Sequence, residues 1–171
     1  MSTIWFDLDG TLYDLYNQPS WLEMLNNENG KVYSCGNSLV NVTDFTNAVK
    51  ALKKQGYKFG VITWLSRDCS RKYGNSIRYH KLKWLNETFP NLFDVVHIVK
   101  YGTDKSKFAT SENDILFDDD ANVCCEWLNS GHTPVCLINQ PYDAHERWIN
   151  ECEIVGNLQA IAKYGVDGFQ W

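Results

Sequence analysis

Two patterns of apolar residues alternate along the chain. Short runs of strand-forming residues recur, and between them lie longer segments whose apolar residues follow a helical spacing. The short runs predict five strands, one beginning at Ile4 and the others at 57–63, 94–99, 114–117 and 134–138. Helices are predicted from Thr43 to Gln55, over 68–88, around 123–128 and near 157–163. In the helix over 68–88, Arg78, Lys81 and Lys83 are expected to face water. Strands that alternate with helices favour a parallel sheet covered by helices on both faces, with right-handed crossovers.

One segment, residues 13–42, interrupts this alternation. It holds a short apolar patch at 21–25 followed by the turn-rich sequence of residues 26–30, and it offers little core of its own. A chain of 171 residues is long enough for one well-buried core. We therefore expect one domain over residues 1–171, with residues 13–42 as a small cap or flap inserted within it.

Charge and cysteine content narrow the class of protein. The formal net charge of -5 and the pI near 5.3 disfavour a long nucleic acid or an anionic membrane surface as a partner. The six cysteines form no CxxC pair, and the adjacent Cys124 and Cys125 could scarcely bridge each other. The N-terminus enters a strand directly, without an apolar signal segment, and no long membrane span follows. We expect reduced thiols and a cytoplasmic protein.

Two acidic residues end the first apolar run. Asp7 and Asp9 follow it one residue apart, and Gly10 then lets the backbone turn sharply out of the strand. Because strand side chains alternate, both carboxylates point to the same side, where a hard cation such as Mg²⁺ would relieve their repulsion. The pair predicts a metal-assisted site at the carboxyl edge of the sheet. The alternatives are a solvated turn and a fragment of a calcium loop, and no Glu follows at the spacing that the calcium loop requires.

Polar residues also stand at or after the carboxyl ends of three later strands. They are Thr63 with Trp64, Lys105 in the segment 101–105, and the acidic run Asp118, Asp119 and Asp120. Ligands of open parallel sheets bind outside these ends, so we expect the side chains to share one site with Asp7 and Asp9. Thr63 could instead merely suit a strand end, and the acidic run could be a solvated turn. Lys100 and Lys107 are local alternatives to Lys105, which we favour because an Asp104-Lys105 pair follows the third strand.

The order and types of these residues resemble the haloacid dehalogenase (HAD) superfamily of phosphotransferases. The resemblance covers residues 4 to about 138 and rests on Phe6-Asp7-Leu8-Asp9-Gly10-Thr11-Leu12, Val61-Ile62-Thr63, Lys105, and Ile115-Leu116-Phe117-Asp118-Asp119. It implies a Rossmann-like three-layer αβα sandwich with a five-stranded parallel sheet and a very small cap.

The resemblance also implies a role for each residue. Asp7 would be the nucleophile that forms an aspartyl-phosphate, and Asp9 the acid that protonates the leaving oxygen and later the base that activates water. Thr63 and Trp64 would donate a hydroxyl and a backbone N–H to the phosphoryl oxygens, and Lys105 would neutralise charge. Magnesium would be held by Asp7, the backbone carbonyl of Asp9 and Asp118, with Asp119 as a direct ligand or as a partner of the ligands.

The intact Asp7 and Asp9 pair favours phosphatase over dehalogenase chemistry, and the short insertion favours phosphatase over mutase. The segments around Asp104-Lys105 and Asp118-Asp119 are similar to those of 5'(3')-deoxyribonucleotidases, so a nucleoside monophosphate is the first expected substrate. A polynucleotide 3'-phosphatase, another small-metabolite phosphatase and a catalytically silent phosphate-binding module are the alternatives. For the silent module, the insertion and the tail 169–171 would be the contact surface.

Aromatic residues near the predicted site admit two interpretations. Trp64 and the group Tyr13, Tyr16 and Trp21 could stack on a base, or they could form a hydrophobic lid or the contact of a homodimer. We favour the second interpretation.

Overall fold

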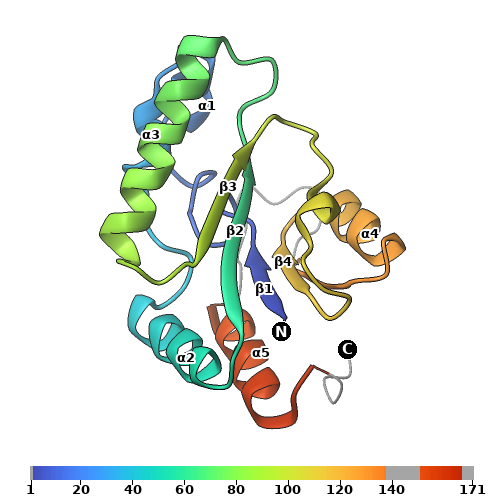
Figure 1. The fold of residues 1–171 in the computed structure, drawn as a ribbon. Coiled ribbons are helices and arrows are strands. Elements are labelled where there is room, and N and C mark those ends of the chain that lie inside the picture. The colour runs from blue at the N-terminus through green and yellow to red at the C-terminus, as the bar shows by residue number, and fades with distance from the viewer. Residues whose placement is uncertain (1, 138–150, 167–171) are drawn as a thin grey trace.

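The computed structural model describes residues 2–137 and 151–166, and side chains of the second range from residue 154 onward. Its centre is a fully parallel sheet with the strand order β3-β2-β1-β4-β5 (Figure 1). The strands are β1 (Thr3–Phe6), β2 (Lys58–Trp64), β3 (Val95–Val99), β4 (Ile115–Asp118) and β5 (Thr133–Cys136). The predicted Rossmann-like α/β fold with five parallel strands is confirmed. Residue 138, which the sequence placed in the last strand, and the tail 169–171 lie outside the described residues.

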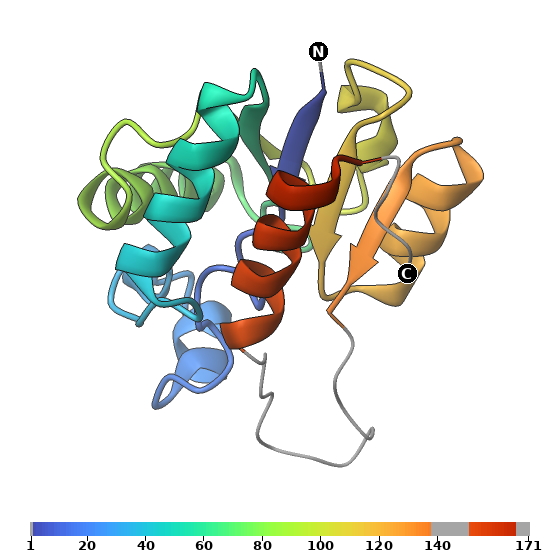
Figure 2. The ribbon, with the colours of Figure 1, turned by 90° about the horizontal axis from the view of Figure 1, so that it is seen from below.

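Helices cover both faces of this sheet. They are α1 (Trp21–Asn26), α2 (Val42–Lys54), α3 (Arg71–Thr88), α4 (Ala121–Asn129) and α5 (Glu151–Tyr164), with the 3-10 turns η1 (Gly30–Tyr33) and η2 (Lys105–Phe108). Helices α2, α3 and α5 share one hydrophobic core with the sheet, and α5 packs beside α2 (Figure 2). Helix α4 and η2 cover the opposite face. Within residues 2–137 and 151–166, no helix is long and apolar enough to cross a membrane.

The alternation of strand side chains divides the core into two parts. Phe6 faces α2 and α3 and stacks on Phe117 of the neighbouring strand, with 4.8 Å between the ring centroids. Trp5, its neighbour in the chain, points to the other face and packs with Trp127 of α4. All four rings are almost completely buried, and each contributes about 1.5–3 kcal/mol to the stability of the fold.

The insertion packs onto the main domain. Its turn η1 lies against α3, and Tyr13, Val32 and Tyr33 are buried in the core that the sheet shares with α3. The Tyr13 hydroxyl donates a hydrogen bond to the Val32 carbonyl, and its ring meets Trp84 of α3 edge-on at 4.9 Å. The few apolar residues of the insertion are therefore used to attach it to α3.

A buried carboxylate fixes the start of β1 to the segment before β4. Asp114, fully buried, accepts hydrogen bonds from Thr3 N at 2.7 Å and Ser111 Oγ at 2.8 Å through Oδ1. Its Oδ2 accepts from Trp5 Nε1 at 3.0 Å, Thr110 N at 2.6 Å and Thr110 Oγ1 at 2.9 Å. Burial by itself would raise the pKa of Asp114, but these hydrogen bonds outweigh it and lower the pKa below its usual range.

Candidate active site

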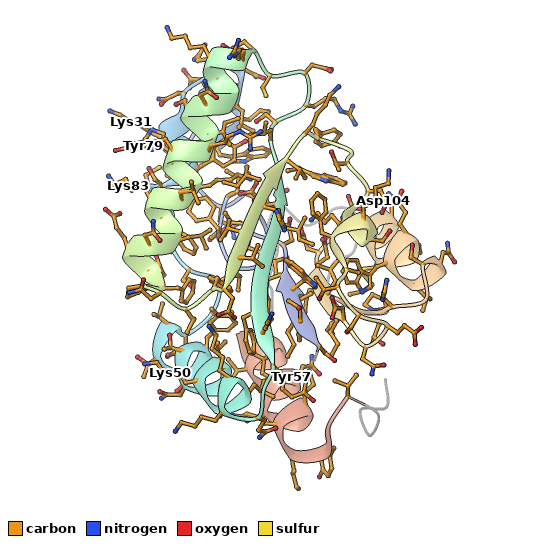
Figure 3. All side chains as sticks on the ribbon, in the orientation of Figure 1. Lys31, Lys50, Tyr57, Tyr79, Lys83 and Asp104 are labelled. Atoms are coloured by element: carbon orange, nitrogen blue, oxygen red, sulfur yellow. A yellow bond between two sulfur atoms is a disulfide. The ribbon has the colours of Figure 1, made fainter. Side chains whose placement is uncertain are left out.

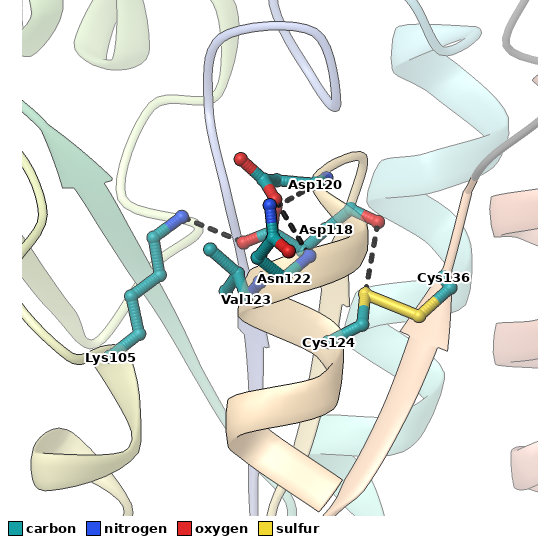
Figure 4. Close-up of a disulfide and its surroundings, with 7 residues drawn as sticks. All are labelled: Lys105, Asp118, Asp120, Asn122, Val123, Cys124 and Cys136. Carbon is teal, nitrogen blue, oxygen red and sulfur yellow. Dashed lines mark hydrogen bonds and ion pairs between the residues drawn. A yellow bond between two sulfur atoms is a disulfide. The ribbon is translucent and has the colours of Figure 1, made fainter.

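Three adjacent strands carry predicted site residues to one edge of the sheet. Strands β2, β1 and β4 are neighbours, and Thr63, Asp7 and Asp118 lie at or directly after their carboxyl ends. Lys105, the first residue of η2, extends between the two aspartates. Its Nζ donates to Asp7 Oδ1 at 2.5 Å and to Asp118 Oδ2 at 2.7 Å, and Figure 4 shows the second of these contacts. Residues that are 111 positions apart in the chain thus form one ionic cluster.

Lys105 is the lysine of its segment that faces the carboxylates. Its side chain is only 2% exposed, whereas Lys100 and Lys107 are exposed to solvent. Burial would lower the pKa of Lys105, but the charges of Asp118 and Asp7 raise it above its ordinary value, so the ammonium stays charged. Burial, together with the nearby charge of Asp7, raises the pKa of Asp118 to about 6 against the opposing effect of Lys105. The cluster therefore has a strong affinity for positive charge.

Asp9 lies on the turn that leaves β1. Gly10 has a φ of +86°, in the left-handed region, and a side chain there would clash with the carboxylate of Asp119. The turn after β1 and the acidic loop after β4 are therefore in direct contact. Burial raises the pKa of Asp9, with an opposing effect from the charge of Lys81. Among the described residues, Asp9 Oδ1 is buried without a hydrogen-bond partner, whereas Oδ2 is held by Lys81.

Lys81 is a site residue that sequence reasoning placed wrongly. The sequence indicated a solvent-facing position on α3, but the side chain is completely buried. Its Nζ donates to Asp9 Oδ2 at 2.5 Å, Thr63 Oγ1 at 2.8 Å and the Trp64 carbonyl oxygen at 2.7 Å. It also lies 4.8 Å from the centre of the Tyr33 ring, from the insertion. The site therefore contains two buried ammonium groups.

A signal for Lys81 is present in the sequence. Residues on the buried face of a helix recur at intervals of three and four, and α3 buries Tyr73, Ile77, Trp84 and Leu85. Lys81 follows Ile77 by four positions and precedes Leu85 by four, so it belongs to the same apolar stripe. A lysine in such a stripe needs a buried acidic partner, and Asp9 is that partner here.

Thr63 and Trp64 lie where the sequence placed them, at the end of β2 beside the carboxylates. Thr63 is fully buried and its hydroxyl oxygen accepts from Lys81. The indole N–H of Trp64 donates to the Thr103 carbonyl at 2.8 Å, and its ring lies 5.0 Å from Lys105 Nζ. The Trp64 ring thus covers the buried lysine at the edge of the site.

A row of aromatic and cationic groups continues from Trp64 to the surface. Tyr101 packs against Trp64 with 5.0 Å between ring centroids, and the Arg67 guanidinium lies 4.8 Å above the Tyr101 ring. On the insertion, Tyr16 meets Trp21 edge-on at 5.3 Å. These contacts place aromatic side chains beside the site.

The donor set fits a divalent cation in kind and in charge. Mg²⁺ prefers carboxylate oxygens. The two buried ammonium groups pair with three carboxylates, which leaves one negative charge in excess. The Asp119 carboxylate, beside Gly10, adds a second. Asp9 Oδ1 is a further buried oxygen, and it has no hydrogen-bond partner in the part of the chain that the structure describes. Within residues 2–137 and 151–166, no three His, Cys, Asp or Glu side chains converge tightly enough to hold a metal by themselves. Lys105 instead joins Asp7 to Asp118, using one oxygen of each carboxylate.

A disulfide lies directly behind the acidic loop and corrects the expectation of reduced thiols throughout. Cys124, in the first turns of α4, is bonded to Cys136 at the end of β5, and the Cys124 sulfur lies 3.7 Å from the Asp118 carbonyl oxygen (Figure 4). The sequence did not indicate this pair because the two residues come together only when α4 packs on β5 beside β4. Cys35, Cys69 and Cys125 are free thiols.

Comparisons with known proteins gave matches among solved structures. Neither a protein-family model nor a curated protein sequence matches the chain. An uncharacterized protein from Corynebacterium glutamicum is 16% identical over 93% of this chain and 96% of its own, with a TM-score of 0.45. The HAD domain of the effector protein Lem4 from Legionella pneumophila is 14% identical over 94% of this chain and 96% of its own, with a TM-score of 0.42. The fold assignment made above rests on the strand order and connections of the chain itself.

Proposed function

We propose that the protein is a Mg²⁺-dependent phosphomonoesterase of the HAD type that works through an aspartyl-phosphate on Asp7. One observation carries the proposal: carboxylates, a hydroxyl and buried lysines meet at the carboxyl edge of a parallel sheet. Thr63, Lys105 and Asp118 supply the groups that hold a phosphoryl group and its counter-charge. The resemblance of their sequence motifs to the HAD superfamily gives the same reaction.

In the first half-reaction, a carboxylate oxygen of Asp7 attacks the phosphorus atom. The bond between phosphorus and the ester oxygen breaks, and Asp9 gives its proton to that oxygen, which departs as an alcohol. Lys105 lies beside Asp7 and neutralises negative charge that would otherwise repel the anionic phosphate. Burial favours the protonated form of Asp9 that this step needs, since it raises the pKa of the carboxyl group.

In the second half-reaction, water attacks the same phosphorus atom. Asp9, now ionised, takes a proton from the water, the bond between phosphorus and Asp7 breaks, and inorganic phosphate leaves. Mg²⁺, held by Asp7, the Asp9 carbonyl and Asp118 with support from Asp119, would supply Lewis-acid stabilisation of the phosphoryl oxygens. Thr63 and the Trp64 backbone would orient those oxygens for both attacks.

We propose a nucleoside monophosphate as the substrate class. The segments around Lys105 and Asp118 support it, because they are similar to those of 5'(3')-deoxyribonucleotidases. The aromatic side chains beside the site, Trp64 and Tyr101 among them, are suited to contact a base. The insertion packs down on α3 and includes only one short helix and one 3-10 turn, which suits a site that is only lightly covered.

Phosphate release tests the proposal. The panel would contain deoxyribonucleotides, ribonucleotides, sugar phosphates and a 3'-phosphorylated oligonucleotide, each with Mg²⁺ or with EDTA. Wild-type protein would be compared with Asp7→Asn and Asp9→Asn, and with Asp44→Asn on the exposed first turn of α2 as the matched control. We expect Mg²⁺-dependent release that both site variants lose and the control retains. Release that survives in Asp7→Asn would refute the mechanism, and a folded protein inactive on the whole panel would favour a silent phosphate-binding module.

A further inference from the structure

Lys81 is a buried cation that has no role in the two half-reactions described above. An ammonium group has three N–H donors, and here each has an acceptor: Asp9 Oδ2, Thr63 Oγ1 and the Trp64 carbonyl. No donor remains for a phosphoryl oxygen. Lys81 therefore differs from Lys105, which contacts the nucleophile itself.

We propose that Lys81 is a positioning residue that fixes the direction of two protons in the active site, those of Thr63 and Asp9. The inference rests on the proposed phosphatase function and assigns a task within it. Lysine donates and does not accept, so each group that contacts Lys81 must present a lone pair to it and turn its own proton elsewhere.

The contact with Lys81 sets the direction of the Thr63 O–H bond. The hydroxyl oxygen accepts from Lys81 at 2.8 Å, so the O–H bond must point away from α3. Thr63 is fully buried at the carboxyl end of β2, which is the neighbour of the strand that leads to Asp7. The hydroxyl is thereby held as a donor toward the space where the phosphoryl group would be, and it needs no rearrangement when substrate binds.

For Asp9, the same rule selects one carboxylate oxygen. Oδ2 faces the ammonium at 2.5 Å and cannot carry a proton there, because Lys81 has no lone pair to accept it. Oδ1 is the buried oxygen that lacks a hydrogen-bond partner among the described residues. A protonated Asp9 therefore carries its proton on Oδ1, and this is the oxygen that delivers it to the leaving group and later receives a proton from water.

Burial alone does not explain a lysine at this position. Taking an ammonium and a carboxylate out of water costs several kcal/mol per ion, and an apolar residue in the stripe of α3 would avoid that cost. Lys81 is completely buried all the same, with the Tyr33 ring of the insertion 4.8 Å from its Nζ. The insertion thus contributes to the site by keeping water away from this lysine.

The test compares esters that differ in their need for a proton. In Lys81→Met, kcat/KM for an alkyl phosphate, whose leaving oxygen requires protonation, should fall about 100-fold or more, the effect of losing a general acid. For p-nitrophenyl phosphate, whose leaving group departs readily without a proton, the loss should be about tenfold or less. Lys83→Met is the matched control, because Lys83 lies two positions further along α3 and points to solvent (Figure 3). It should change neither rate.

Binding of inorganic phosphate tests the Thr63 part separately. Lys81→Met should weaken product inhibition by phosphate about tenfold, the effect of one misdirected hydroxyl. Thr63→Val should do the same, and the double variant should be no worse than either single one, because both remove the same hydrogen bond. Additive losses would show that Lys81 acts independently of Thr63 and would overturn this part of the inference.

The outcomes distinguish this inference from the proposed function. A wild-type protein that hydrolyses neither ester refutes the phosphatase itself. A wild-type protein that hydrolyses both, with equal losses for the two esters in Lys81→Met, refutes only the positioning role. Circular dichroism would establish that each variant is folded. If Lys81→Met does not fold, Lys81→Arg takes its place, since it keeps the charge but not the contacts with all three acceptors. The loss of kcat/KM must again be larger for the alkyl phosphate than for p-nitrophenyl phosphate.

Discussion

Asp114→Asn should destabilise the fold by about 2–4 kcal/mol near neutral pH. The carboxylate accepts five hydrogen bonds on two oxygens, and an amide offers only one oxygen. The less costly orientation places the amide oxygen toward Trp5 and Thr110. The Ser111 hydroxyl can then rotate and accept, but the buried Thr3 N–H loses its acceptor, which costs about 1–3 kcal/mol. The bonds that remain also lose the assistance of a negative charge, which adds about 1 kcal/mol.

The penalty of this substitution should shrink in acid. The pKa of Asp114 is lowered in the folded state, so its contribution to stability is complete above the unfolded pKa of about 3.9 and is lost as the pH falls through the folded pKa. Asn does not titrate. The wild-type protein should therefore lose this part of its stability in acid, whereas Asp114→Asn has already lost it.

Urea unfolding followed by tryptophan fluorescence at about pH 7 and about pH 3.5 would measure both effects. We expect a gap of about 2–4 kcal/mol between wild type and variant at the higher pH, and a smaller gap at the lower pH. A gap that is absent at neutral pH, or that widens in acid, would refute the reasoning, because the hydrogen bonds to Asp114 would then not be the cause.

Three shorter predictions concern the site. Gly10→Ala should lower the free energy of unfolding by about 1–2 kcal/mol, because alanine is unfavourable in the left-handed region. It should also reduce phosphate release by displacing the acidic loop. Unfolding and activity would be measured on the same preparation. Lys105→Met should lower kcat about 100-fold or more in the phosphate-release assay, with Lys107→Met as the exposed control. Cys136→Ser should lower the free energy of unfolding by up to about 3 kcal/mol, the loop-closure value for residues 12 positions apart. Because Cys124 is buried, labelling is done on unfolded wild-type protein, and iodoacetamide should modify Cys124 only after reduction.

The fold could be predicted because the sequence patterns that specify its strands and helices are local. Each strand is an apolar run and each long helix an amphipathic one, so their alternation was enough to predict a parallel α/β sheet. The disulfide was not predicted from the sequence, because Cys124 and Cys136 meet only through the packing of α4 on β5. Spacing rules that recognise CxxC pairs contain no information on such a contact.

The sequence likewise predicted some of the site residues and missed another. Asp7 and Asp9 are separated by one residue in the sequence, and Asp118 ends a strand, so strand polarity alone was enough to predict that they lie at one edge. Lys81 was assigned to solvent because lysine is usually exposed, although its position in the stripe of α3 indicated burial. A charged residue at a core position of a helix indicates a partner elsewhere in the chain, and here that partner is Asp9, which the sequence had placed in the site without linking it to Lys81.

The most direct test of the proposed chemistry is to trap the covalent intermediate. A single turnover with the preferred substrate and Mg²⁺ would be quenched in acid, and peptide mass spectrometry would locate the phosphoryl group. The mechanism predicts a phosphorylated Asp7 that hydroxylamine releases, and no such species in Asp7→Asn. Phosphate release in which Asp7 never carries the phosphoryl group, or turnover that persists in Asp7→Asn, would contradict it.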